Sequence, residues 1–261
     1  MGNYISAPNT EKDIECSDRI ELPILVKNSD TENNTENNTE NITENKNICS
    51  QESDLTELDY NPKLLKACTD GDLATVENLV SRGIDYKRFH NEPIIIAASG
   101  GHLKIVKYLI SIGADITDMY GDAIVFASEF GHLEMVKYLV SLGLNVKSQG
   151  DRPLIYASRN GRLDIVKYLI GQGAYVNAQQ GSALIGASEN NHLEVVKYLI
   201  EKGANIRDQC YQSLKMAILY GRLDVVKYFV SQGIKINDIF SNFAIDNGRN
   251  DIADYLKANN L

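Results

Sequence analysis

The stretch "GHLEMVKYLVSLGLNV", residues 131–146, predicts one amphipathic helix that ends at a glycine. Nearly the same phrase stands before it as "GHLKIVKYLISIGADI" (101–116) and after it as "GRLDIVKYLIGQGAYV" (161–176), at equal spacing. Its apolar residues recur with the period of an α-helix, so one face is built to be buried. A phrase repeated at a fixed interval is typical of stacked structural units, each presenting the same face to the next.

The glycine that opens the phrase predicts a sharp turn between two helices. The position is occupied, in chain order, by Gly71, Gly101, Gly131, Gly161, Asn191 and Gly221. Asparagine is among the few residues besides glycine that adopt a positive φ readily. The single exchange of glycine for asparagine therefore predicts a left-handed backbone at this position in every unit.

A shorter apolar segment precedes each turn and ends in small residues, as in "PIIIAAS", "AIVFAS", "PLIYAS" and "ALIGAS". Small side chains allow helices to approach closely, so this segment predicts a second helix packed against the first. Neither helix could bury its apolar face alone, whereas stacked copies can. We therefore predict an all-α repeat solenoid of seven units with short inter-repeat loops over residues 60–261. The last unit should be more polar, because Asn250 and Asp254 replace apolar and lysine residues.

The segment 1–59 has a different composition from the repeats. "TENNTENNTENITEN", residues 31–45, contains one apolar side chain, and such a segment cannot bury enough surface to offset its ordering entropy. We predict a disordered tail there. Residues 1–60 hold 14 acidic and 4 basic residues, whereas residues 61–261 hold 21 acidic and 22 basic ones. The repeats therefore offer no net positive charge for nucleic acid, and no nucleic-acid partner is expected.

The N-terminus "MGNYIS" fits M-G-x-x-x-[ST], which marks Gly2 as a candidate for N-myristoylation, although so short a pattern also matches by chance. One acyl chain gives only marginal membrane binding, so any contact should be weak and reversible. No apolar run is long enough to cross a membrane, and no signal peptide is recognisable. With four scattered cysteines, these features favour a cytoplasmic protein.

Three repeated side chains have both a functional and a structural interpretation. His102, His132 and His192 lie in separate units, too far apart to share a metal ion, so we expect a structural role and no metal site. The tyrosine ladder that includes Tyr138 could stack bases, but packing between units is the better interpretation. The lysine of each unit, Lys137 for example, follows an acidic residue by three positions in most units. This spacing predicts ion pairs on the helix surface. No catalytic motif occurs, and no cofactor is expected.

"GHLEMVKYLVSLG" and "GHLKIVKYLISIGAD" resemble the second-helix signature of ankyrin repeats. The family usually has about 33 residues per repeat and T-P-L-H before the first helix. Here the period is shorter, as the spacing of Gly101, Gly131 and Gly161 shows, and the equivalent tetrapeptides are "EPII", "DAIV", "RPLI", "SALI" and "QSLK". We therefore expect shortened loops in place of the family's β-hairpin fingers. With its Asn-rich tail, the sequence resembles ankyrin proteins of amoeba-infecting giant viruses (mimivirus-like) or, as second choice, of social amoebae.

The resemblance implies a non-catalytic, monomeric protein-interaction scaffold or adaptor that binds a host protein on its concave face. In the family, the two residues before the turn face that side, and loop aromatics add to them. The candidate binding residues are Phe89, Tyr120, Glu129, Phe130, Arg159, Asn160, Glu189, Asn190, Tyr211, Leu219 and Tyr220. Two alternatives remain open: a substrate adaptor for a ubiquitin ligase, and an enzyme with an unrecognised site.

Overall fold

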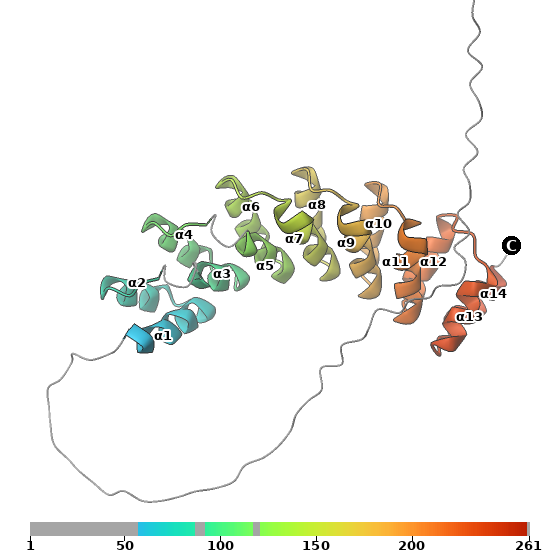
Figure 1. Cartoon of the computed structure of the whole chain (residues 1–261), viewed down its shortest axis with the longest axis horizontal. Coiled ribbons are helices and arrows are strands. Elements are labelled where there is room, and N and C mark those ends of the chain that lie inside the picture. The colour runs from blue at the N-terminus through green and yellow to red at the C-terminus, as the bar shows by residue number, and fades with distance from the viewer. Residues whose placement is uncertain (1–56, 87–91, 117–120, 260–261) are drawn as a thin grey trace, which may run out of the picture. The chain divides into compact units, whose positions relative to one another are not determined.

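The computed structural model describes residues 57–86, 92–116 and 121–259, and within them it contains fourteen helices and no strand (Figure 1). The chain divides into two units, Met1–Gln51 and Glu52–Leu261, and the described residues all belong to the second. The predictions for the tail and for Gly2 lie outside the described residues. The helices are α1 (Glu57–Asp70), α2 (Leu73–Ser81), α3 (Glu92–Ser99), α4 (Leu103–Ser111), α5 (Asp122–Phe130), α6 (Leu133–Ser141), α7 (Ser148–Arg159), α8 (Leu163–Gly171), α9 (Ala178–Glu189), α10 (Leu193–Glu201), α11 (Asp208–Leu219), α12 (Leu223–Ser231), α13 (Asp238–Asp246) and α14 (Asn250–Ala258).

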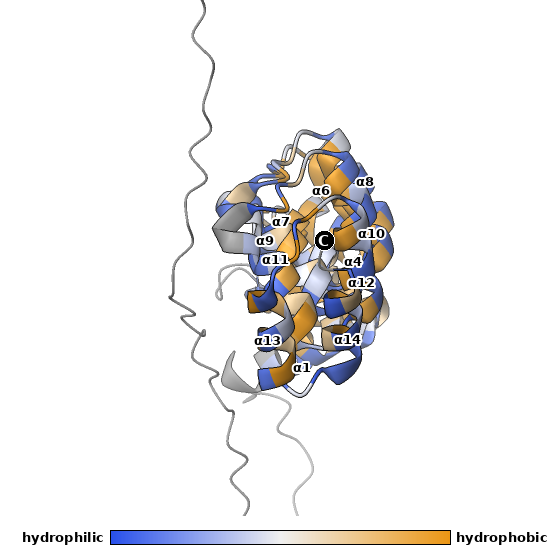
Figure 2. Cartoon of the chain, turned by 90° about the vertical axis from the view of Figure 1, so that its right-hand side faces the viewer, coloured by the Kyte–Doolittle hydropathy of each residue, from blue (hydrophilic) through white to orange (hydrophobic). Residues whose placement is uncertain are grey.

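The helices form seven consecutive antiparallel pairs, each made of an odd-numbered helix and the even-numbered helix that follows it. Figure 2 shows two layers, with α7, α9 and α11 on one side and α8, α10 and α12 on the other. We call these the first-helix layer and the second-helix layer. Consecutive helices pack more extensively in the first-helix layer than in the second. The all-α repeat solenoid predicted from the sequence is confirmed.

The turn inside each pair has the predicted left-handed backbone. Gly161 has a φ of +70°, and Asn191, which replaces glycine in the next repeat, has a φ of +62°. The residue after each turn donates its backbone N–H to the alanine that precedes the turn, as from His192 to Ala187 O at 2.9 Å. That alanine is fully buried, because the two helices come closest there.

Short left-handed turns and side-chain hydrogen bonds connect the central repeats, in place of a β-hairpin. Residues 149–151 all have positive φ, so the regular part of α7 begins at Arg152. The buried carboxylate of Asp151 accepts a hydrogen bond at 2.8 Å from the backbone N–H of Tyr175, which lies in the loop between α8 and α9. Gln179 donates its side-chain N–H to Gly150 O at 2.8 Å. The expectation of shortened loops is therefore confirmed in the part of the chain that the structure describes.

A single hydrophobic core runs through the stack and includes Leu139 and Leu169, both fully buried. The last repeat is only partly as predicted. The exposed face of α14 is polar and carries Asn250 and Asp254. By contrast, α13 leaves Ile239 and Ile245 exposed, so the polar character expected of a stack end is restricted to the second helix.

Candidate functional site

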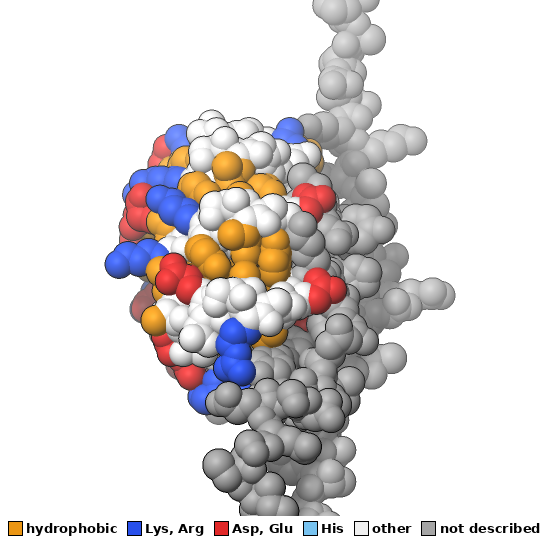
Figure 3. All heavy atoms as spheres, turned by 90° about the vertical axis from the view of Figure 1, so that its left-hand side faces the viewer, with side chains coloured by type: hydrophobic (Ala, Val, Ile, Leu, Met, Phe, Trp, Pro, Cys, Tyr) orange, Lys and Arg blue, Asp and Glu red, His pale blue; other side chains and the backbone are white. Residues whose placement is uncertain are grey.

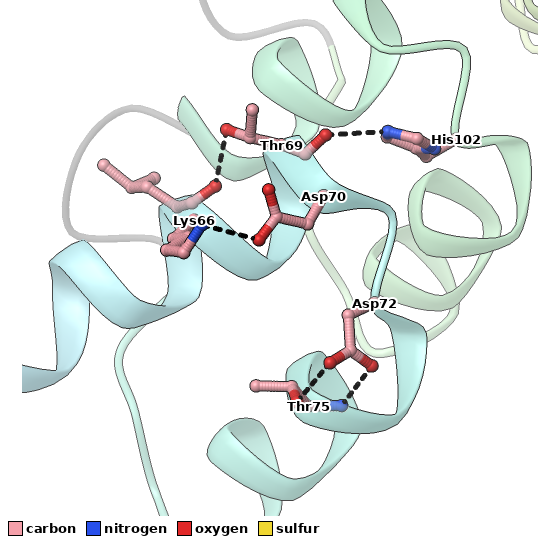
Figure 4. Close-up of polar contacts among 7 residues, drawn as sticks. Lys66, Thr69, Asp70, Asp72, Thr75 and His102 are labelled. Carbon is pink, nitrogen blue, oxygen red and sulfur yellow. Dashed lines mark hydrogen bonds and ion pairs between the residues drawn. The ribbon is translucent and has the colours of Figure 1, made fainter.

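The residue that follows each turn links its repeat to the preceding one. His102 places its ring nitrogen Nε2 2.9 Å from Thr69 O (Figure 4), and His132 places Nε2 2.7 Å from Ser99 O. A carbonyl oxygen only accepts, so the ring nitrogen carries the proton. These carbonyls lie at the C-terminal ends of first helices, where backbone oxygens lack partners within the helix. The structural role predicted for the histidines is confirmed.

Arginine performs the same task where histidine is absent. The guanidinium Nε donates to Glu129 O from Arg162 and to Glu189 O from Arg222, at 3.2 and 2.8 Å. Both side chains therefore reach the end of the first helix in the repeat before their own. An interchange of histidine and arginine thus marks a recurrent inter-repeat hydrogen bond, a signal that the sequence analysis did not use.

The first described repeat has an acid at this position. Asp72 accepts hydrogen bonds from the hydroxyl and the backbone N–H of Thr75, at 2.6 and 3.1 Å (Figure 4). It therefore caps its own helix, α2, rather than contacting another repeat. These hydrogen bonds lower the pKa of the Asp72 carboxyl.

The turn glycine also makes room for the next repeat's histidine. A Cβ atom at Gly161 would lie 2.4 Å from the ring of His192, far inside van der Waals contact. At Gly131, whose neighbour is Arg162, the nearest atom would lie at 3.0 Å and belongs to a flexible side chain. The single asparagine among the turns, at position 191, precedes a repeat that carries arginine. Glycine is therefore required for space as well as for φ wherever histidine follows.

The eight predicted residues before the turns lie in or just after the last turns of α5, α7, α9 and α11, along one edge of the first-helix layer. Phe130 is 50% exposed and Tyr220 is 37% exposed. They are the two large exposed hydrophobic side chains of this set, as binding anchors need to be.

Five other members of the set have side-chain contacts within the chain. Asn160 and Asn190 donate their side-chain N–H groups to the carbonyls four residues earlier, at 2.9 and 3.0 Å, and so cap α7 and α9. Arg159 lies 3.4 Å from Glu189 in the next repeat, and this long ion pair joins a half-exposed guanidinium to a partly buried carboxylate. Leu219 is half-buried against the core. The sequence signal for the caps was an asparagine directly before a left-handed turn.

Two of the three loop aromatics of the prediction, Phe89 and Tyr120, lie outside the described residues. Tyr211 has a φ of +65° and therefore lies in the left-handed turn at the start of α11, as Asp151 does in α7. Its ring packs edge-on against buried Phe240, with centroids 5.7 Å apart, so it joins α11 to α13. The assignment of Tyr211 to partner binding stays a prediction.

The lysine column of the second-helix layer has two kinds of partner. Lys137 forms an ion pair with Glu134 at 2.7 Å, as predicted, and Lys197 pairs likewise with Glu194. Lys167 instead lies over the ring of the next repeat's Tyr198, 5.8 Å from its centre. The acid before Lys167 is an aspartate, one methylene shorter than glutamate, and in this described helix the two form no ion pair. Seen from the left-hand side of Figure 1, charged side chains gather along one edge of the surface (Figure 3).

The described residues offer little other chemistry. Burial raises the pKa of the Cys68 thiol to about 12, so its reactive thiolate is scarce. Within the described ranges, no group of histidine, cysteine and acidic side chains could hold a metal ion. None of the helices there is both long and apolar enough to span a membrane.

The chain matches the family model of ankyrin repeats in three places, over residues 32–120, 118–180 and 178–239. The chain belongs to the ankyrin repeat family. The search among curated proteins found no match. Ankyrin repeats generally serve as protein–protein interaction modules, typically without catalytic activity, so a binding role follows for this ankyrin repeat protein as a class.

Proposed function

We propose that this protein is a non-catalytic scaffold or adaptor that binds a partner protein on the first-helix layer, with Phe130 and Tyr220 as anchors. The supporting observation is a comparison of the residue directly before the turn in successive repeats. In the neighbouring repeats Asn160 and Asn190 cap their helices there. Phe130 and Tyr220 forgo that hydrogen bond and expose an aromatic ring instead. Aromatic side chains are frequent anchors of interfaces, since they bury a large area at low entropic cost.

The test uses a captured partner and matched variants. Proximity labelling with the full chain in amoebal cells identifies candidates, and the purified partner is then titrated against each variant. Phe130→Ala or Tyr220→Ala should weaken binding by about 1–3 kcal/mol without a comparable loss of stability. The control is Lys137→Ala with Lys167→Ala in the second-helix layer, which should change binding by less than about 0.5 kcal/mol. Binding that is lost with the lysine pair and kept by both aromatic variants would place the interface on the opposite layer.

We further propose that the partner is a host protein met in the cytoplasm by a monomeric chain of viral origin. Support comes from the resemblance to ankyrin proteins of giant viruses. If Gly2 is acylated, membrane contact is weak, because one acyl chain is marginal.

Co-expression with an N-myristoyltransferase tests the lipid anchor. Intact-mass spectrometry should show one acyl chain, and the chain should be absent from Gly2→Ala. In vesicle sedimentation most of the acylated protein should stay in the supernatant. A wild-type chain that retains an unmodified Met1 would exclude acylation.

A further inference from the structure

The first-helix layer carries a distinctive stripe on α5. Asp122, Phe126 and Phe130 follow one another at the i, i+4 spacing, so they share one face of the helix, and Glu129 lies beside them. Phe126 is half-buried and Phe130 is half-exposed. Among the described side chains, neither belongs to the core or to the residues packed against it. These two rings are therefore apolar surface that the fold itself does not use.

Helix α3, which packs beside α5, continues the same arrangement. Glu92 and Ile96 occupy the positions that Asp122 and Phe126 have in the next repeat, and both are partly exposed. We define the α3–α5 patch as Glu92, Ile96, Asp122, Phe126, Glu129 and Phe130.

The α3–α5 patch is acidic within its own two helices. Its two helices contain three carboxylates and no basic residue. Within the described part of the chain no lysine or arginine pairs with any of the three. Asp122 accepts a hydrogen bond from Gln149 at 2.6 Å, and an amide donor leaves its negative charge in place.

The charge changes sign at the next helix, so the patch has a boundary. Arg152 and Arg159 are the charged side chains at the surface of α7, since Asp151 is buried. Arg152 donates to the Tyr156 hydroxyl at 3.0 Å and lies over the same ring. A cation of a partner is therefore attracted to α3 and α5 and repelled by α7, which confines it to the two helices.

We propose that the α3–α5 patch binds a cationic amphipathic segment of a partner protein. Apolar side chains of that segment cover Phe126 and Phe130, and its lysine or arginine residues meet Glu92, Asp122 and Glu129. The inference rests on the proposed function, and it adds the chemistry of the partner and the repeats that recognise it. Complementary charge sets the location, and the rings supply the apolar area.

The probe is a synthetic helix of leucine and lysine, about 14 residues or roughly four turns long, with leucines in one stripe. It carries a fluorophore and a photo-crosslinking group. Two peptides serve as comparisons: a scrambled isomer, and a version with glutamate in place of lysine. Fluorescence anisotropy with the full chain measures affinity at several salt concentrations, and mass spectrometry of the crosslinked product maps the site.

The lysine peptide should bind more tightly than both comparisons and should crosslink to α3 and α5. Phe130→Ala should weaken it by about 5-fold or more. Asp122→Asn with Glu129→Gln should weaken it by roughly 3- to 10-fold and flatten the salt dependence. Tyr175→Ala, which removes an exposed aromatic in the loop between α8 and α9, should leave its affinity unchanged.

Crosslinks in the acidic tail or the second-helix layer, or equal affinity for the scrambled peptide, would overturn the inference. So would a loss of affinity on Tyr175→Ala equal to that on Phe130→Ala. Failure of this inference can be distinguished from failure of the proposed function. If a natural partner depends on Tyr220 and not on the α3–α5 patch, the scaffold role stands and only the chemistry assigned to the patch is wrong.

Discussion

Gly161 meets two separate demands, one from its own turn and one from the repeat that follows. Its φ of +70° belongs to the left-handed region, where asparagine is also tolerated. Its missing side chain leaves space for the ring of His192, which hydrogen-bonds the backbone at Arg159. Burial, and with it the nearby charges of Arg162 and Arg222, lower the pKa of His192 against the opposing effect of its hydrogen bond to the backbone at Arg159, so the neutral ring is favoured.

Gly161→Asn should therefore be costly although Asn191 occupies the same position one repeat later. The expected loss of unfolding free energy is about 1–3 kcal/mol, because the new Cβ displaces the His192 ring. Gly131→Asn, which faces Arg162, should cost less. Adding His192→Arg to Gly161→Asn should recover much of the loss. Urea unfolding of the wild type, Gly161→Asn, His192→Arg and the double variant measures the coupling. Equal costs at the two glycines would mean that backbone conformation alone decides.

At the scale of the helix, the ends of the first helices divide into capped and open ones. The side chains of Asn160 and Asn190 each donate a second hydrogen bond to a carbonyl in the last turn of α7 and α9, which also accepts the backbone N–H of the same asparagine. Helix α5 ends instead with Phe130, whose ring is exposed. The end of α5 thus carries an exposed ring at the position where α7 and α9 carry an asparagine that adds a hydrogen bond.

Phe130→Asn should raise stability and lower binding together. The asparagine can supply the cap seen at the ends of α7 and α9, which is worth about 0.5–1.5 kcal/mol. The thermal midpoint should therefore rise, while affinity for a partner or for the leucine–lysine peptide falls. Asn160→Ala is the reverse control and should lower the midpoint by a similar amount. A Phe130→Asn protein that is less stable than the parent would show that the ring contributes to folding.

At the scale of the whole stack, stability depends on contacts between neighbouring repeats. The core is continuous from α1 to α14, so removing atoms in the middle affects repeats on both sides. At the end of the stack, Ile239 and Ile245 remain exposed on α13. Within the described residues, α13 and α14 contact only the preceding repeat, and local opening should begin where contacts are fewest.

Leu169→Ala should destabilise the entire stack by about 2–5 kcal/mol, because Leu169 is fully buried in the fourth repeat. Leu256, equally buried but in the last repeat, is the matched control. Leu256→Ala should open the last repeat first and broaden the transition, as hydrogen exchange and urea unfolding would show. If the two variants unfold in the same single transition, the stack is more cooperative than nearest-neighbour contacts imply.

The sequence by itself determined the period, the helix pairs, the left-handed turns and the face of each helix that is buried. These features depend on helical spacing and on backbone preferences at single positions such as Gly161 and Asn191, and both act within one repeat. The tertiary structure alone decided which groups meet across repeats. His102 reaches Thr69 in the preceding repeat, Lys167 reaches Tyr198, and the Tyr211 ring meets Phe240. Such contacts depend on how far one repeat is displaced along the next and on the length of the side chains that span the gap. The periodic pattern of apolar residues within a single unit specifies neither.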